Sequence, residues 1–186
     1  MKKSALAFLL LSGLGAAADA ADPTGEFTAT ARVETHSGTR STACTIIINR
    51  PIPYEEAAPL RKLLEEGGQQ AVRTAILGGS RGKLSLGGIA YPLDLVIFEP
   101  KDKGFRYVVV TSRPIRWEES EFGESSLDYP FTVLVFEEPA VGLGEGQIVP
   151  RAALEIDEDG HVRAVAHEGR MGVLKEIRRK SHMNRE

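Results

Sequence analysis

Residues 91–111, YPLDLVIFEPKDKGFRYVVVT, decide the fold of this chain. On both sides of a Pro-Lys-Asp-Lys-Gly turn, apolar side chains recur at every second position, which is the period of a β-strand with one buried face. Two such segments joined by a turn of this composition predict an antiparallel hairpin. The positions predicted to alternate are Tyr91, Leu93, Leu95 and Ile97 before the turn and Phe105, Tyr107, Val109 and Thr111 after it.

Two further strands are predicted on the N-terminal side of this hairpin. Residues 27–33 alternate between apolar and polar side chains, which indicates a strand with one face in water. Residues 44–48, CTIII, carry apolar side chains on both faces, so we expect a central strand, or one under the helices that follow. Cys44 is the single cysteine of the chain and is expected to be a buried strand residue that forms no internal disulfide.

Residues 54–77 change to a helical period. Alanine and leucine side chains fall on one side of the predicted helix, and charged side chains cover the other. Gly67 and Gly68 are expected to end this helix, and a second short helix over residues 69–77 follows. Pro59 predicts a kink or a later start. The insert is therefore predicted to be a helical hairpin.

The C-terminal part of the chain is again β in pattern. A long connection leads to a predicted strand at residues 131–136, and a last hairpin turns at residues 158–160, Glu-Asp-Gly. With Gly160 in the left-handed conformation, the apolar faces of the two strands agree. The register that follows sets Ile156 opposite Val162 and Leu154 opposite Ala164.

Together these elements predict an α+β fold that is mainly antiparallel β. We expect a barrel-like or curled sandwich of about eight strands, with the helical hairpin inserted after the second strand. A single domain over residues 21–174 is long enough to bury one ordinary core.

Residues 1–20 have the pattern of a secretory signal peptide. Lys2 and Lys3 precede an apolar run that is too short to cross a bilayer, and Ala18 and Ala20 stand at the spacing that signal peptidase recognises. The pattern is typical of bacterial general export, so we expect the mature protein to be periplasmic or extracellular. Residues 175–186 are predicted to be a basic, flexible tail.

The charge balance argues against a nucleic-acid partner. The chain has 23 Lys and Arg against 26 Asp and Glu, a formal net charge of −3, whereas nucleic-acid-binding domains carry clustered basic excess. After residue 20 every apolar run is too short to span a membrane as a helix. The partners we expect are a small apolar ligand or an envelope protein.

Residues 78–82, GGSRG, match the G-x-S-x-G pattern of a nucleophile elbow. With Ser80 as nucleophile and His161 or His167 as base, a small serine hydrolase is an alternative function. An elbow follows a strand and begins a helix, whereas here the predicted helix precedes the serine and a strand follows it. A linker is therefore the preferred interpretation.

Metal and cofactor motifs are incomplete. The phosphate-loop pattern at residues 78–85 lacks the required spacing and has Leu84 in place of a magnesium-binding Ser or Thr. Residues 155–166 resemble part of an EF-hand but end in Ala166 where a bidentate glutamate is needed. The four histidines form no metal triad. We predict no cofactor, with calcium at the acidic residues 118–128 as an alternative.

The predicted function is binding without catalysis. Apolar strand faces favour a small apolar ligand or an envelope component, and the long 113–130 connection interleaves aromatic with acidic side chains. The expected binding rim consists of Trp117, Phe122 and Tyr129. A structural or interaction module that docks through a sheet edge or the basic tail is a further alternative.

Overall fold

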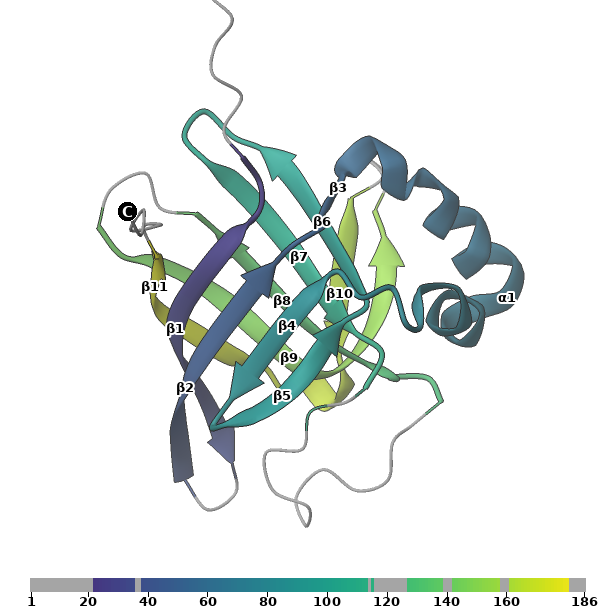
Figure 1. Cartoon of the computed structure of the whole chain (residues 1–186). Coiled ribbons are helices and arrows are strands. Elements are labelled where there is room, and N and C mark those ends of the chain that lie inside the picture. Colours follow the sequence, from purple (N-terminus) through teal and green to yellow (C-terminus); the bar gives the residue numbers. More distant parts are fainter. Residues whose placement is uncertain are drawn as a thin grey trace, which may run out of the picture.

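One strongly curled sheet contains all the strands of the described chain (Figure 1). The computed structural model describes residues 22–35, 38–113, 115, 127–138, 142–157 and 161–180. The strands are β1 (Gly25–Thr35), β2 (Gly38–Ile48), β3 (Ile52–Pro53), β4 (Gly82–Leu86), β5 (Ile89–Leu93), β6 (Leu95–Pro100), β7 (Phe105–Thr111), β8 (Phe131–Glu137), β9 (Gly144–Ile156), β10 (Val162–Ala166) and β11 (Gly172–Arg179). The helices are η1 (Tyr54–Ala57), α1 (Ala58–Ile76) and η2 (His167–Gly169).

The strand order is β3-β6-β7-β8-β9-β11-β1-β2-β4-β5, with β10 paired to β9. The β3–β6 pair is parallel, and the other pairs are antiparallel. The expected α+β fold with a curled, mainly antiparallel sheet is thus confirmed. The expected number of about eight strands is too small, because the described residues already form a sheet of 11 strands. The number rises because β3 and β11 were not expected and because the strand predicted at residues 91–97 is divided between β5 and β6.

The stretch at residues 91–111 forms the predicted hairpin in its second part only. β6 pairs with β7 from Leu95–Val110 to Pro100–Phe105. The first part belongs to a different edge, because β5 and β6 lie far apart in the strand order although Asp94 alone separates them. The side-chain alternation also breaks there. Leu93 packs in the core on the concave side of the sheet, which we call the inner core. Leu95 packs in a second core on the other side, under α1, which we call the outer core.

The inner core fills the concave side of the curl. Phe27, Tyr107 and Phe136 form its aromatic centre, with ring centroids 5.0–5.4 Å apart. All three side chains are at most 1% exposed. Aromatic pairs at these separations add to the burial of apolar area. Side chains from β1, β2, β4 to β9 and β11 complete this cluster.

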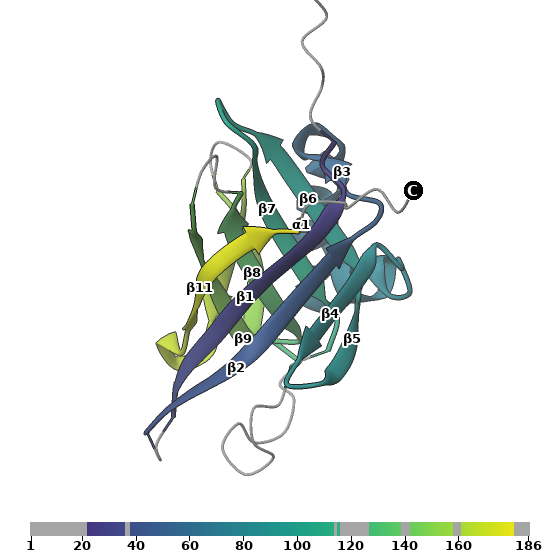
Figure 2. The same cartoon turned by 60° about the vertical axis from the view of Figure 1, so that its left-hand side comes forward.

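A second core lies on the outer side of β6 to β9, under α1. Leu60, Val72 and Ile76 are the buried side chains of the helix, and they cluster with apolar side chains of β6, β7, β8 and β9. This explains why β7 and β8 are apolar on both faces. The strand at residues 44–48 does not lie under the helix, because β11, β1, β2 and β4 stand side by side with α1 beyond them (Figure 2).

The helical insert is one bent helix preceded by a short 3-10 turn. Gly68 has φ 64° and ψ −161°, a conformation that is nearly restricted to glycine, and the helix kinks there. The predicted break at Gly67 and Gly68 and the helical segment after it are thus confirmed, and the two segments join directly at Gly68 as one kinked element. Pro59 lies in the first turn of α1, where its missing N–H costs no helical hydrogen bond. No helix of the described residues is long and apolar enough to cross a membrane.

The last hairpin has the predicted register. Ile156 pairs with Val162 and Leu154 pairs with Ala164, while the turn at residues 158–160 lies outside the described residues. The basic C-terminal stretch differs from the expectation. Residues 175–179 are the end of β11, which pairs with β1 and β9, so they are ordered in the sheet. Residues 181–186 of the expected tail lie outside the described part.

Candidate functional site

A groove lies between α1 and β9, and two side chains of the helix set its width. Gln69 Nε2 donates to the Leu154 carbonyl oxygen (2.8 Å), and Leu154 N–H donates back to Gln69 Oε1 (2.9 Å). Nearer the start of the helix, Arg61 Nη2 donates to the Asp157 carbonyl oxygen (2.7 Å). These long polar side chains fasten the helix to the strand and also hold it at a distance.

The helix meets β9 where one edge of that strand is free of β8. β8 pairs with β9 only up to the Phe131–Ala152 pair, whereas β10 covers the other edge up to Ile156. The backbone groups of alternate residues point to the same edge of a strand. Because Leu154 points its N–H and C=O at Gln69, Ile156 also directs its backbone towards the groove.

Two adjoining hollows occupy the groove, with volumes of about 120 and about 320 Å³. Arg61 and Ile156 line both, so the hollows meet at these residues. The smaller hollow is also lined by Tyr54, Glu55 and Ala58, and the larger by Leu64, Glu65, Gln69, Leu154 and Glu155. Apolar lining side chains such as Ile156 and Leu64 pack against the outer core. The groove thus has an apolar floor and a charged rim.

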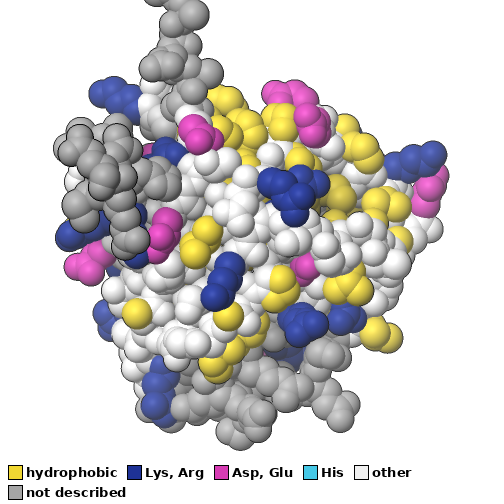
Figure 3. Space-filling view, viewed as in Figure 1, with side chains coloured by type: hydrophobic (Ala, Val, Ile, Leu, Met, Phe, Trp, Pro, Cys, Tyr) yellow, Lys and Arg dark blue, Asp and Glu magenta, His cyan; other side chains and the backbone are white. Residues whose placement is uncertain are grey.

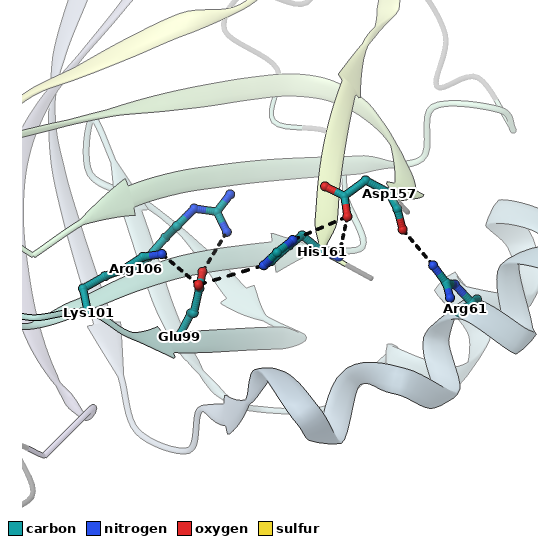
Figure 4. Close-up of polar contacts among 6 residues, drawn as sticks. All are labelled: Arg61, Glu99, Lys101, Arg106, Asp157 and His161. Atoms are coloured by element: carbon teal, nitrogen blue, oxygen red, sulfur yellow. Dashed lines mark hydrogen bonds and ion pairs between the residues drawn. The ribbon is translucent and has the colours of Figure 1, made fainter. Parts of the chain in front are cut away.

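His161 packs against Tyr54, which lines one end of the groove. Its ring stacks on the Tyr54 ring with centroids 4.9 Å apart. His161 Nδ1 lies 3.5 Å from Asp157 Oδ1, and the His161 N–H donates to the same oxygen (2.8 Å). On its other side, His161 Nε2 lies 3.9 Å from Glu99 Oε1 (Figure 4). The ring is therefore held between two carboxylates.

Glu99 connects this cluster to the β6–β7 hairpin. Lys101 Nζ donates to Glu99 Oε1 (2.7 Å), and Arg106 Nη1 lies 3.6 Å from Glu99 Oε2. The Lys101 hydrogen bond holds the pKa of the Glu99 carboxyl below its usual value, and the nearby positive charges act in the same direction. Partial burial opposes this shift. Glu99 is therefore ionised at neutral pH and serves as an anchor for three basic side chains.

The structure does not bring Ser80 together with either candidate base. Ser80 lies at the start of β6, because its neighbours Gly78 and Arg81 donate hydrogen bonds to Asp94 and Leu93, respectively. His161 contacts Glu99, which is near the end of β6. Five residues of strand amount to ~16 Å. His167 lies beside Pro150 of β9, and the three strand spacings from β6 to β9 amount to ~14 Å. Neither separation fits a nucleophile and base, which must be within hydrogen-bond reach.

Of the predicted rim, the structure describes Tyr129. Its ring is half-buried and packs edge-on against the His167 ring, with centroids 4.9 Å apart. Trp117 and Phe122 lie outside the described residues, as does the acidic stretch except for its end, where Asp128 is exposed. Within the described ranges, no group of three or more His, Cys, Asp or Glu side chains is arranged to hold a metal. Calcium at residues 118–128 stays a prediction.

Two buried reactive groups have structural roles. Asp94 is 3% exposed, and its carboxylate accepts hydrogen bonds from Gly78 N–H (3.1 Å) and from the Ser112 N–H and hydroxyl (both 2.7 Å). It thereby ties the end of α1 to β6 and β7. Cys44 is 1% exposed in the inner core, and burial raises the pKa of its thiol to about 12. Such a thiol stays protonated and is a poor nucleophile.

The residues that line the groove were missed by sequence reasoning. Arg61 and Glu65 have the pattern of a solvated helix face, and Gln69 gives no signal at all. Their common position depends on β9 and the residue after it, which are distant in sequence. Leu154 lies 85 residues beyond Gln69, and Asp157 lies 96 residues beyond Arg61. The register of Leu154 and Ile156 is the part of the groove that the sequence indicates. Comparison of the chain with models of protein families, with characterised proteins and with solved structures finds no match.

Proposed function

We propose that this chain is an exported bacterial protein that binds a small, largely apolar ligand in the groove between α1 and β9, without catalysis. The observation that carries the proposal is the pair of adjoining hollows, of about 120 and about 320 Å³, with an apolar floor. Small-molecule sites are typically concave and mostly apolar, with volumes from ~300 Å³ upwards and a few fixed polar groups.

The groove is a better candidate than the inside of the curl. The inner core is occupied by Phe27, Tyr107 and Phe136 and the apolar side chains around them. A ligand there would have to displace close-packed side chains. In the groove, by contrast, Gln69 and Arg61 hold the walls apart before any ligand arrives, so binding requires little ordering of the protein.

Arg61 is the polar group that would orient a ligand in the groove. Its guanidinium is oriented by the Asp157 carbonyl oxygen and borders both hollows. A ligand with an apolar body along Ile156 and a hydrogen-bond acceptor near Arg61 fits this arrangement. Glu55 and Glu65 stand at the rim of the two hollows and disfavour a strongly anionic ligand.

The binding experiment uses the neutral apolar dye Nile red and two matched variants on one helix. Ala58 lines the smaller hollow, whereas Ala75 is exposed on α1 and lines neither of the two. We expect saturable fluorescence enhancement with the unmodified protein, its loss in Ala58→Phe, and its retention in Ala75→Phe. Equal dye binding by both variants would place the site elsewhere, and no saturable binding would remove the proposal.

The export part of the proposal rests on the pattern of residues 1–20. Expression of the full chain in a bacterium, followed by fractionation and N-terminal sequencing, should recover a periplasmic or secreted form that begins at Ala21. A protein that stays in the cytoplasm and begins at Met1 contradicts export but leaves ligand binding untouched.

A further inference from the structure

The acidic residues are distributed unevenly over the chain. Residues 38–54 and 67–93 contain five Lys and Arg and not one Asp or Glu, although the whole chain has 26 acidic residues. These two ranges form β2, β3, β4, β5 and the second half of α1. Their basic residues are Arg40, Arg50, Arg73, Arg81 and Lys83.

Three of these side chains come together where β2 ends and β4 begins, and we call Arg50, Arg81 and Lys83 the basic face. The Arg50 N–H donates to the Arg81 carbonyl oxygen (3.2 Å). Lys83 stands two residues further along β4, opposite Ile47 of β2. Two residues of strand span ~7 Å, so the three charges are close neighbours.

The two guanidinium groups of the basic face are oriented by carbonyl oxygens. Arg50 Nη2 donates to the Ser80 carbonyl oxygen (2.8 Å), and Arg81 Nη1 donates to the Arg50 carbonyl oxygen (3.1 Å). Among the residues that the structure describes, none of the ion pairs involves the basic face. Its positive charge is therefore held in place without a carboxylate to neutralise it.

Within the described residues, the acidic side chain next in sequence does not supply that neutralisation. Asp94, the acidic residue next in sequence, is 3% exposed and takes its hydrogen bonds from Gly78 and Ser112. Figure 3 shows several Lys and Arg side chains over the front of the molecule, with most acidic side chains towards the margins and a small acidic patch near the centre. The residues of β2, β3, β4 and β5 thus include basic and no acidic side chains, in a protein whose net charge is negative.

We propose that the basic face docks the protein on a membrane surface rich in anionic phospholipid headgroups. Three cations held close together on the sheet surface match the phosphates of neighbouring anionic lipids. The exposed Pro92 of β5, which pairs with Lys83 of β4, adds an apolar contact beside the charges. The inference does not depend on the groove, and it gives the protein an envelope partner of stated chemistry.

The experiment is co-sedimentation of the full chain with vesicles of phosphatidylcholine alone or mixed with phosphatidylglycerol. Each Lys or Arg near an anionic surface contributes ~1 kcal/mol, so we expect each Gln substitution to weaken binding about fivefold, and the triple Arg50→Gln, Arg81→Gln, Lys83→Gln variant to weaken it about a hundredfold. The matched control replaces Lys62, Lys103 and Arg163, which are exposed elsewhere, by Gln. It changes net charge equally and should keep most of the binding.

Equal losses in the two triple variants would mean that net charge alone acts and would overturn the assignment. Equal binding to both kinds of vesicle, or binding to duplex DNA without binding to the anionic vesicles, would also overturn it. Lys83→Gln removes no described hydrogen bond, so its effect can be measured without damage to the Arg50–Arg81 turn. Arg50→Lys with Arg81→Lys should retain binding. Nile red binding in the same variants should be unchanged, which separates this test from that of the groove.

Discussion

The attachment of α1 to β9 through Gln69 can be tested by Gln69→Leu. Leucine keeps much of the apolar volume but removes both hydrogen bonds to Leu154, and it leaves a partly buried N–H and C=O without partners. A typical hydrogen bond contributes ~0.5–1.5 kcal/mol net, so two of them amount to ~1–3 kcal/mol. We expect the free energy of unfolding to fall by this amount in urea denaturation followed by circular dichroism.

Gln70→Leu is the matched control on the neighbouring position. Gln70 Nε2 donates one exposed hydrogen bond, to the Leu127 carbonyl oxygen (2.7 Å), so its loss should cost less than ~1 kcal/mol. We also expect Gln69→Leu to weaken Nile red binding, because the width of the groove is no longer fixed. If the two leucine variants had the same stability and the same dye affinity, the reasoning that Gln69 sets the groove would be refuted.

Three further predictions concern buried or anchored groups. Asp94→Ala removes the acceptor of hydrogen bonds from Ser112 and should lower the free energy of unfolding by on the order of 3 kcal/mol or more, measured in urea. Because Lys101 lowers the pKa of Glu99 from its usual 4.5, this carboxylate stabilises the fold above pH 4.5 and loses the effect as the pH falls through the lowered value. Glu99→Gln should therefore reduce the fall in the free energy of unfolding at acid pH. The same pH dependence in the variant and the unmodified protein would contradict this role of Glu99. The Cys44 thiol should resist alkylation at pH 8 in the native protein and react in urea, whereas fast native reaction would contradict its burial.

The parts of the fold that sequence predicts are those set by local period. The alternation at residues 105–111 belongs to one strand, and the Leu154 to Ala164 register follows from a short turn between apolar faces. The break at Asp94 could not be predicted in the same way. Tyr91 to Ile97 alternate without interruption, and only the bonds from Gly78 and Ser112, both distant in sequence, show that this chain leaves one edge and enters another.

The candidate site was less predictable than the fold, for the same physical reason. Its walls come from a helix and a strand about half the chain apart, and charged helix residues such as Arg61 have the same pattern whether they face water or a groove. The basic face could be predicted from the sequence only in part. The absence of acids in residues 67–93 is visible in the sequence, but only the pairing of β2 with β4 brings Arg50 beside Arg81 and Lys83.

The groove follows from the way in which α1 is attached. Only Leu60, Val72 and Ile76 of the helix are buried, which is few for a helix of 19 residues, and apolar contact alone would draw such a helix onto the sheet until the space closed. Gln69 and Arg61 instead bridge to backbone carbonyl oxygens of β9 and the turn after it. These side chains act as spacers as well as fasteners. The unfilled volume along Ile156 is therefore a direct consequence of polar attachment.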